Sequence, residues 1–141
     1  MIEYLQIPIG PSDGRRLYAE YVATNAAYAL GIRPPAVRFF LHRPTPDGWP
    51  GEARTDARHL AGETRPDQLD RIWVLGSLAR HELASVVAHE THHVWWYGVH
   101  GTSYGHYNAR EQAVMERAAD SFALRFTQTQ PTQPTRRRSS R

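Results

Sequence analysis

A segment reading AHETHHVWW constrains this chain more than any other part of it. It contains the pattern H-E-x-x-H at His89, Glu90 and His93. Residues four apart on an α-helix lie about 40° apart around the axis and roughly 6 Å apart along it, so their side chains share one face. Two imidazoles on that face can bind one Zn²⁺ at ~2.0–2.1 Å each. Glu90 then reaches the open side of the ion, where it can take a proton from a water molecule.

The pattern also has an ordinary explanation, a helix with histidines on its surface. His92 illustrates it, because this residue lies among the others but matches no ligand position. We expect His92 to face solvent or to support the ligands from behind. A catalytic zinc further needs a third protein ligand and one open coordination position. The rest of the chain therefore has to supply a third ligand.

The string ERAADSFA, residues 116–123, offers that ligand. Glu116 can supply a carboxylate from a second helix that packs across the first. Asp120 lies one turn later on the same face, where it can accept the remaining N–H of a zinc-bound imidazole. We expect that imidazole to be His89, and such a bond fixes the tautomer of the ring. The three alanines of the string permit the close helix approach that a shared ion requires.

The two motifs together resemble those of the gluzincin metallopeptidases, in which H-E-x-x-H is followed by E-x-x-x-D. The fuller string E-x-x-A-D-x-F-A is similar to small cytosolic members, the phage-type minigluzincins and the protease domains of the ImmA/IrrE kind. The resemblance covers roughly residues 12–127. It implies a minimal zincin fold, zinc as the cofactor and Glu90 as the general base. The implied zinc ligands are His89, His93 and Glu116, with Asp120 orienting His89.

The chain also contains two histidines that are alternative third ligands. The metzincin pattern requires Gly at position 96 and His at position 99, and the chain has Trp96 and Val99 there, which excludes that family. His100 and His106 lie in the following loop and can in principle reach the metal, as in SprT-type metalloproteases. We expect Glu116 to be the ligand and keep these two histidines as alternatives.

The same loop has a second candidate role. Tyr104, His106 or Tyr107 can donate a hydrogen bond to the oxyanion of a tetrahedral intermediate. Ordinary packing is the alternative for each tyrosine.

Hydrophobic periodicity and turn residues divide the chain into short elements. The predicted order is a helix, a strand, a long loop with a short strand, a second strand and two helices, which makes a small α+β domain. The expected ranges are 12–30, 36–42, 44–70 with the short strand near 57–60, 71–75, 78–97 and 109–127.

Four residues mark the expected helix ends. Ser12 is the predicted N-cap of the first helix and Gly31 its stop, while Ser77 caps the H-E-x-x-H helix and Gly98 ends it. The first helix carries Leu17, Tyr21, Thr24 and Tyr28 at helical spacing.

Composition bounds the remaining possibilities. A chain of 141 residues predicts one domain, residues 1–128, with a disordered Arg-rich tail at 129–141. The net charge of +3 comes largely from that tail, because the body alone carries 13 basic and 14 acidic residues. There is no cysteine, which excludes disulfides and thiolate metal sites. No apolar run approaches the ~18 residues that span a bilayer, so we expect no membrane association and a cytoplasmic location.

The resulting hypothesis is a zinc-dependent endopeptidase that hydrolyses peptide bonds in peptide or protein substrates. We expect an extended substrate to pair with a free edge of strand 71–75. Three kinds of enzyme fit the chain: one specific for a protein partner, a general peptidase, or a latent enzyme. The alternative is a non-enzymatic zinc-binding interaction module, with weak nucleic-acid contact through Arg136, Arg137, Arg138 and Arg141.

Overall fold

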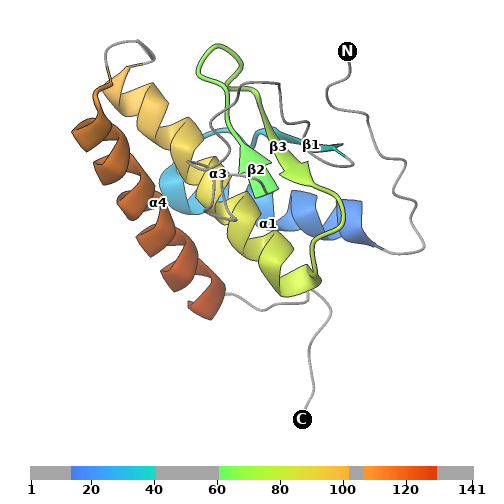
Figure 1. The fold of residues 1–141 in the computed structure, drawn as a ribbon. Helices are drawn as coiled ribbons and strands as arrows, with labels where there is room; N and C mark the ends of the chain where they lie inside the picture. The colour runs from blue at the N-terminus through green and yellow to red at the C-terminus, as the bar shows by residue number, and fades with distance from the viewer. Residues whose placement is uncertain (1–13, 41–60, 102–106, 130–141) are drawn as a thin grey trace, which may run out of the picture.

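The computed structural model describes residues 14–40, 61–101 and 107–129. Within them the elements follow in the order α1 (Arg15–Leu30), β1 (Ala36–Phe40), β2 (Gly62–Glu63), β3 (Arg71–Leu75), α3 (Arg80–His100) and α4 (Ala109–Thr129) (Figure 1). The predicted α+β class with a zincin-like element order is confirmed. The predicted short strand at 57–60 and most of the Arg-rich tail lie outside the described residues.

The sheet is mixed and has the strand order β1-β3-β2. β1 and β3 are parallel, with Ala36 opposite Arg71 and Phe40 opposite Leu75. β2 is antiparallel to β3, with Gly62 opposite Val74. β3 is therefore the central strand, and the expectation that strand 71–75 presents a free edge is wrong. The short strand β2 occupies that side of β3.

One face of the sheet is apolar because side chains alternate along each strand. Val37 and Phe39 of β1 lie beside Ile72 and Val74 of β3, and all four are at most 3% exposed. Both α1 and α3 contribute to the same hydrophobic cluster, so they cover this face together. α3 packs against α1, α4, β2 and β3, which makes it the helix around which the domain is assembled (Figure 1).

The buried face of α1 does not include Leu17 and Tyr28, two of the residues at helical spacing in the sequence. Leu17 is 64% exposed and Tyr28 is 87% exposed, whereas the residues that face the core are four alanines together with Tyr18 and Val22. Alanine permits a shorter distance between α1 and α3 than leucine or tyrosine does. Gly31 ends the helix with φ 75°, as predicted, and Ser12 lies outside the described residues.

The ends of α3 differ from the predicted ones. The helix begins at Arg80, after Ala79, so Ser77 is not its N-cap. The carboxylate of Glu82 instead accepts the Ala79 N–H at 3.2 Å. The helix also continues through Gly98 to His100 and ends at Gly101, which has φ 100°. A single glycine in a helix is unfavourable by about 1 kcal/mol but does not stop a helix whose other face is well packed.

α4 begins at the predicted residue, Ala109, and ends at Thr129, two residues beyond the predicted end of the helix. Asn108 and Glu111 form a reciprocal capping box at its start: Glu111 N–H donates to the Asn108 side chain at 2.8 Å, and Asn108 N–H donates to the Glu111 carboxylate at 2.9 Å. Met115, Ala119, Ala123 and Phe126 form its buried side. No helix among the described residues is sufficiently long and apolar to cross a membrane.

Candidate metal centre

The middle of α3 buries an uninterrupted run of polar side chains. Residues 89–93 are all at most 6% exposed, although they comprise three histidines, a glutamate and a threonine. Polar groups removed from water are unfavourable unless they find partners inside the protein. The partners of His89, Glu90 and His93 come from α4 and from the segment at β2, so these three residues form a buried polar centre, whereas the Thr91 hydroxyl donates to the Val87 carbonyl within α3.

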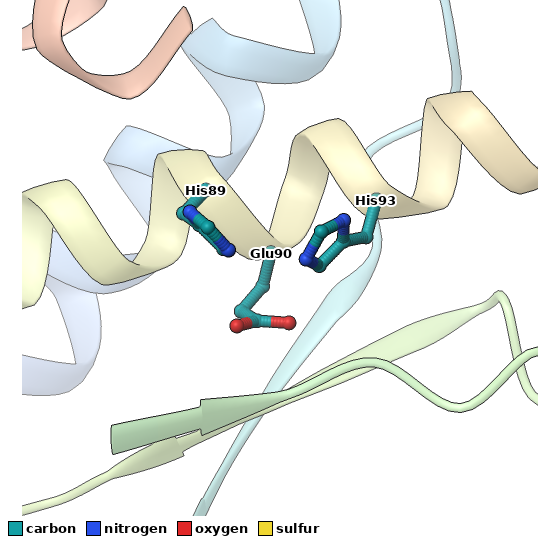
Figure 2. A group of neighbouring side chains, drawn as sticks. All are labelled: His89, Glu90 and His93. Atoms are coloured by element: carbon teal, nitrogen blue, oxygen red, sulfur yellow. The ribbon is translucent and has the colours of Figure 1, made fainter. Parts of the chain in front are cut away.

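His89 and His93 project from the same side of α3, and the Glu90 carboxylate lies between them toward the strands (Figure 2). The two rings are 4.6 Å apart between centroids and nearly perpendicular. Ligand atoms of His89, Glu90 and His93 all lie within 4.8 Å of one another. Together the three can hold a metal ion.

The side chain of Glu116 reaches this pair of rings from α4. Its Oε1 lies 3.0 Å from Nε2 of His89 and its Oε2 lies 3.2 Å from Nε2 of His93. Atoms bound to one tetrahedral zinc at ~2.0–2.1 Å lie about 3.3 Å apart, so these spacings suit a shared ion. The Glu116 side chain is 32% exposed, whereas the His89 side chain is 5% exposed.

Asp120 contacts the other nitrogen of the His89 ring. Its Oδ1 lies 2.9 Å from His89 Nδ1, one helical turn beyond Glu116. A carboxylate at that position favours a proton on Nδ1, and the lone pair on Nε2 is then available to a metal.

The electrostatics of the centre follow from this arrangement. Burial by itself lowers the pKa of the His89 imidazole, but the hydrogen bond to Glu116 and the charges of Glu90, Glu116 and Asp120 outweigh it and raise that pKa. Burial raises the pKa of the Glu116 carboxyl, but His89 and His93 hold it well below its usual range. The metal-free centre thus keeps Glu116 ionised, which is the form that binds a cation.

Glu90 has a separate set of partners that sequence reasoning missed. The hydroxyl of Thr64 lies 2.6 Å from Glu90 Oε1, and 3.1 Å from the Glu90 carbonyl oxygen. Gly62 lies so close that a Cβ built on it would be 2.8 Å from Glu90 Oε2. No motif marks Thr64 or Gly62, because they come 26 and 28 residues before Glu90 and meet it only through the pairing of β2 with β3.

His92 lies on another side of α3. It is 6% exposed and packs against the rings of Trp95 and Phe122, with centroids 5.1 and 5.2 Å away. Of the two expectations for His92, the one that it faces solvent is therefore wrong. Burial, together with the charges of His93, His89 and Arg125, lowers its pKa to about 4.

Two of the four candidate residues at the end of α3 and in the loop after it lie among the described residues. His100 is exposed and stacks on Trp96, with ring centroids 4.0 Å apart. The hydroxyl of Tyr107 donates to the Gly101 carbonyl at 3.1 Å, and its ring lies 5.7 Å from that of Tyr97. Tyr104 and His106 lie outside the described residues.

Fold and centre together define a class: an α+β domain of zincin-like architecture whose central helix carries a His/Glu/His cluster able to bind a metal. A family model described as a predicted Zn-dependent protease (DUF2268) matches residues 52–136, more than half of the chain. The chain belongs to this family. Comparisons with curated proteins and with solved structures found no match. The family and the cluster indicate zinc as the cofactor.

Proposed function

We propose that this protein is a zinc-dependent endopeptidase of the gluzincin type, related to the small minigluzincin and ImmA/IrrE-like enzymes. The observation that carries the proposal is the approach of two imidazole Nε2 atoms to the two oxygens of one carboxylate, at 3.0 and 3.2 Å. In this proposal His89, His93 and Glu116 hold the zinc, and Asp120 orients His89. Two imidazoles and one carboxylate leave a fourth position open, which a catalytic site requires and a structural site lacks.

A bound zinc ion supplies Lewis acidity, which polarises a carbonyl and makes water acidic near neutral pH. Glu90 takes a proton from water as the water oxygen bonds to the carbonyl carbon of the peptide. The C–N bond then breaks, and Glu90 passes the proton to the leaving nitrogen. Glu90 suits both transfers because its carboxylate lies between the two imidazoles and beside β2 (Figure 2).

The substrate class follows from the same side of the molecule. β2 is the strand next to Glu90 and lies at the edge of the described sheet. An extended peptide aligned with this strand makes backbone hydrogen bonds, and these are insensitive to side-chain identity. We therefore propose peptide or protein segments in extended conformation as substrates.

The test is a comparison of Glu90→Gln with the wild-type chain, both loaded with one zinc. Glutamine keeps the size of the side chain but cannot accept the proton. We expect zinc stoichiometry and affinity to stay unchanged and cleavage of an unstructured protein substrate to fall by about 10²–10⁴-fold. Glu20→Gln is the matched control, since Glu20 is an exposed residue of α1 whose carboxylate pairs with Arg16.

Full cleavage by Glu90→Gln would remove Glu90 from the mechanism. A wild-type protein that binds zinc tightly and cleaves nothing would instead favour the interaction module. In that case, salt-dependent nucleic-acid binding that disappears on deletion of residues 129–141 would identify its partner.

A further inference from the structure

Two carboxylates compete for the same pair of imidazoles. Glu116 reaches them from α4, and Glu90 is their immediate neighbour on α3. Either one can serve as a metal ligand by its chemistry, and only one can be the base. A metal site with both carboxylates bound would lack a free proton acceptor. Something in the fold must therefore assign the two roles.

Thr64 makes the contact that distinguishes Glu90 from Glu116. Its hydroxyl lies 2.6 Å from Glu90 Oε1, the length of a hydrogen bond from a hydroxyl to an ionised carboxylate. The same hydroxyl lies 3.1 Å from the carbonyl oxygen of Glu90, so Thr64 contacts both the backbone and the carboxylate of this residue. Glu116, by contrast, contacts the two histidines.

Gly62 makes room for this arrangement. A Cβ at position 62 would lie 2.8 Å from Glu90 Oε2 and 2.9 Å from Glu90 Cγ, closer than nonbonded carbon and oxygen atoms approach. Gly62 lies in β2 and Thr64 follows the strand directly, and both positions lie against the Glu90 side chain. One oxygen of the Glu90 carboxylate thus accepts a hydrogen bond from Thr64, and the other occupies space that a side chain at position 62 would fill.

We propose that Thr64 is a positioning residue for Glu90, and that with Gly62 it holds this carboxylate toward β2, leaving the ligand role to Glu116. This inference rests on the proposed function, in which Glu90 is the base. In this role Thr64 acts through the orientation of Glu90.

Three variants of the full zinc-loaded chain test the catalytic part. Thr64→Val keeps the shape and removes the hydroxyl, and Thr64→Ser restores the hydroxyl. Thr91→Val is the matched control, because the Thr91 hydroxyl is also buried but donates to the Val87 carbonyl at 2.7 Å. We expect kcat of Thr64→Val to fall about tenfold, with KM within about twofold of wild type. The Ser variant should recover most of the rate, and the Thr91→Val variant should keep it.

The contact itself is tested without zinc or substrate, by thermal unfolding of Thr64→Val, Glu90→Ala and the double variant. If Thr64 holds Glu90, Thr64→Val lowers Tm in the native background and much less when residue 90 is alanine. Equal losses in both backgrounds would refute the contact.

The two parts fail in different ways. A Thr64→Val enzyme with wild-type kcat, or a Ser variant as slow as the Val variant, overturns the positioning role. A wild-type chain that cleaves nothing overturns the proposed function and with it the catalytic part of this inference. The unfolding cycle then still decides whether Thr64 fixes Glu90.

Discussion

Asp120 Oδ1 lies 2.9 Å from Nδ1 of His89, on the opposite side of the ring from the nitrogen that faces Glu116. A single helix, α4, thus supplies carboxylates to both nitrogens of one imidazole from positions one turn apart. Glu116 faces Nε2 of the ring and Asp120 faces Nδ1. The capping box at the start of α4 and its buried face fix the rotation of the helix that makes this possible.

Replacing Asp120 with asparagine should weaken zinc binding by about 10–100-fold. Asparagine retains an oxygen near His89 Nδ1 but lacks the negative charge that makes the imidazole more basic and therefore a stronger ligand for zinc. The measurement is competition with a chromogenic chelator at fixed pH, together with the zinc content of the dialysed protein.

Asp70→Asn is the control for that experiment. Asp70 is an exposed carboxylate that accepts a hydrogen bond from Arg71, the first residue of β3. Its replacement should leave zinc affinity unchanged. If Asp120→Asn binds zinc as tightly as Asp70→Asn does, the contact with His89 is structural and does not tune the ligand.

The sequence predicted those parts of the centre that local periodicity determines. The positions of His89 and His93 on one face follow from helical geometry alone, and so does the alignment of Glu116 with Asp120. Strand 71–75 was predicted with its observed bounds, because it is a short run of β-branched and aromatic residues before a turn.

The remaining features depend on tertiary pairing, which spacing does not encode. The contact of Thr64 with Glu90 exists only because β2 pairs with β3 beside α3. The central position of β3 has the same origin, and so does the burial of the alanine face of α1 in place of Leu17 and Tyr28. His92 lacked a ligand position in the motif, but Phe122 on α4 covers it.

The burial of His92 predicts a pH dependence of the free energy of unfolding. Its pKa is about 4 in the folded protein, against 6.5 for an unperturbed imidazole. Above pH 6.5 the ring is neutral in both states and contributes no pH dependence. Between pH 6.5 and 4 the unfolded chain takes up the proton and the folded protein does not. The contribution of His92 to the free energy of unfolding should therefore fall as the pH falls, by at most about 1.4 kcal/mol per pH unit.

Urea unfolding of the zinc-free protein at pH 7, 6 and 5 measures this contribution. His92→Phe removes the titrating group and keeps an aromatic ring beside Trp95 and Phe122, so its stability should decline less steeply over the same interval. Parallel pH profiles for wild type and His92→Phe would show that the ring is not held neutral by its surroundings.

Gly62 and Gly98 form a matched pair for the steric argument at Glu90. A methyl group at position 62 would meet the Glu90 side chain and Val86 at 2.8–2.9 Å, whereas nothing lies within 4 Å of one at position 98. Gly62→Ala should therefore destabilise the fold by about 1–3 kcal/mol and displace the base, lowering kcat while zinc remains bound. Gly98→Ala should stabilise α3 by about 0.5–1 kcal/mol and leave kcat unchanged.

Urea unfolding and steady-state kinetics on the two variants separate the effects, because a general intolerance of alanine would affect both positions. A Gly62→Ala enzyme with native kcat would show that Glu90 has room to work without a glycine beside it.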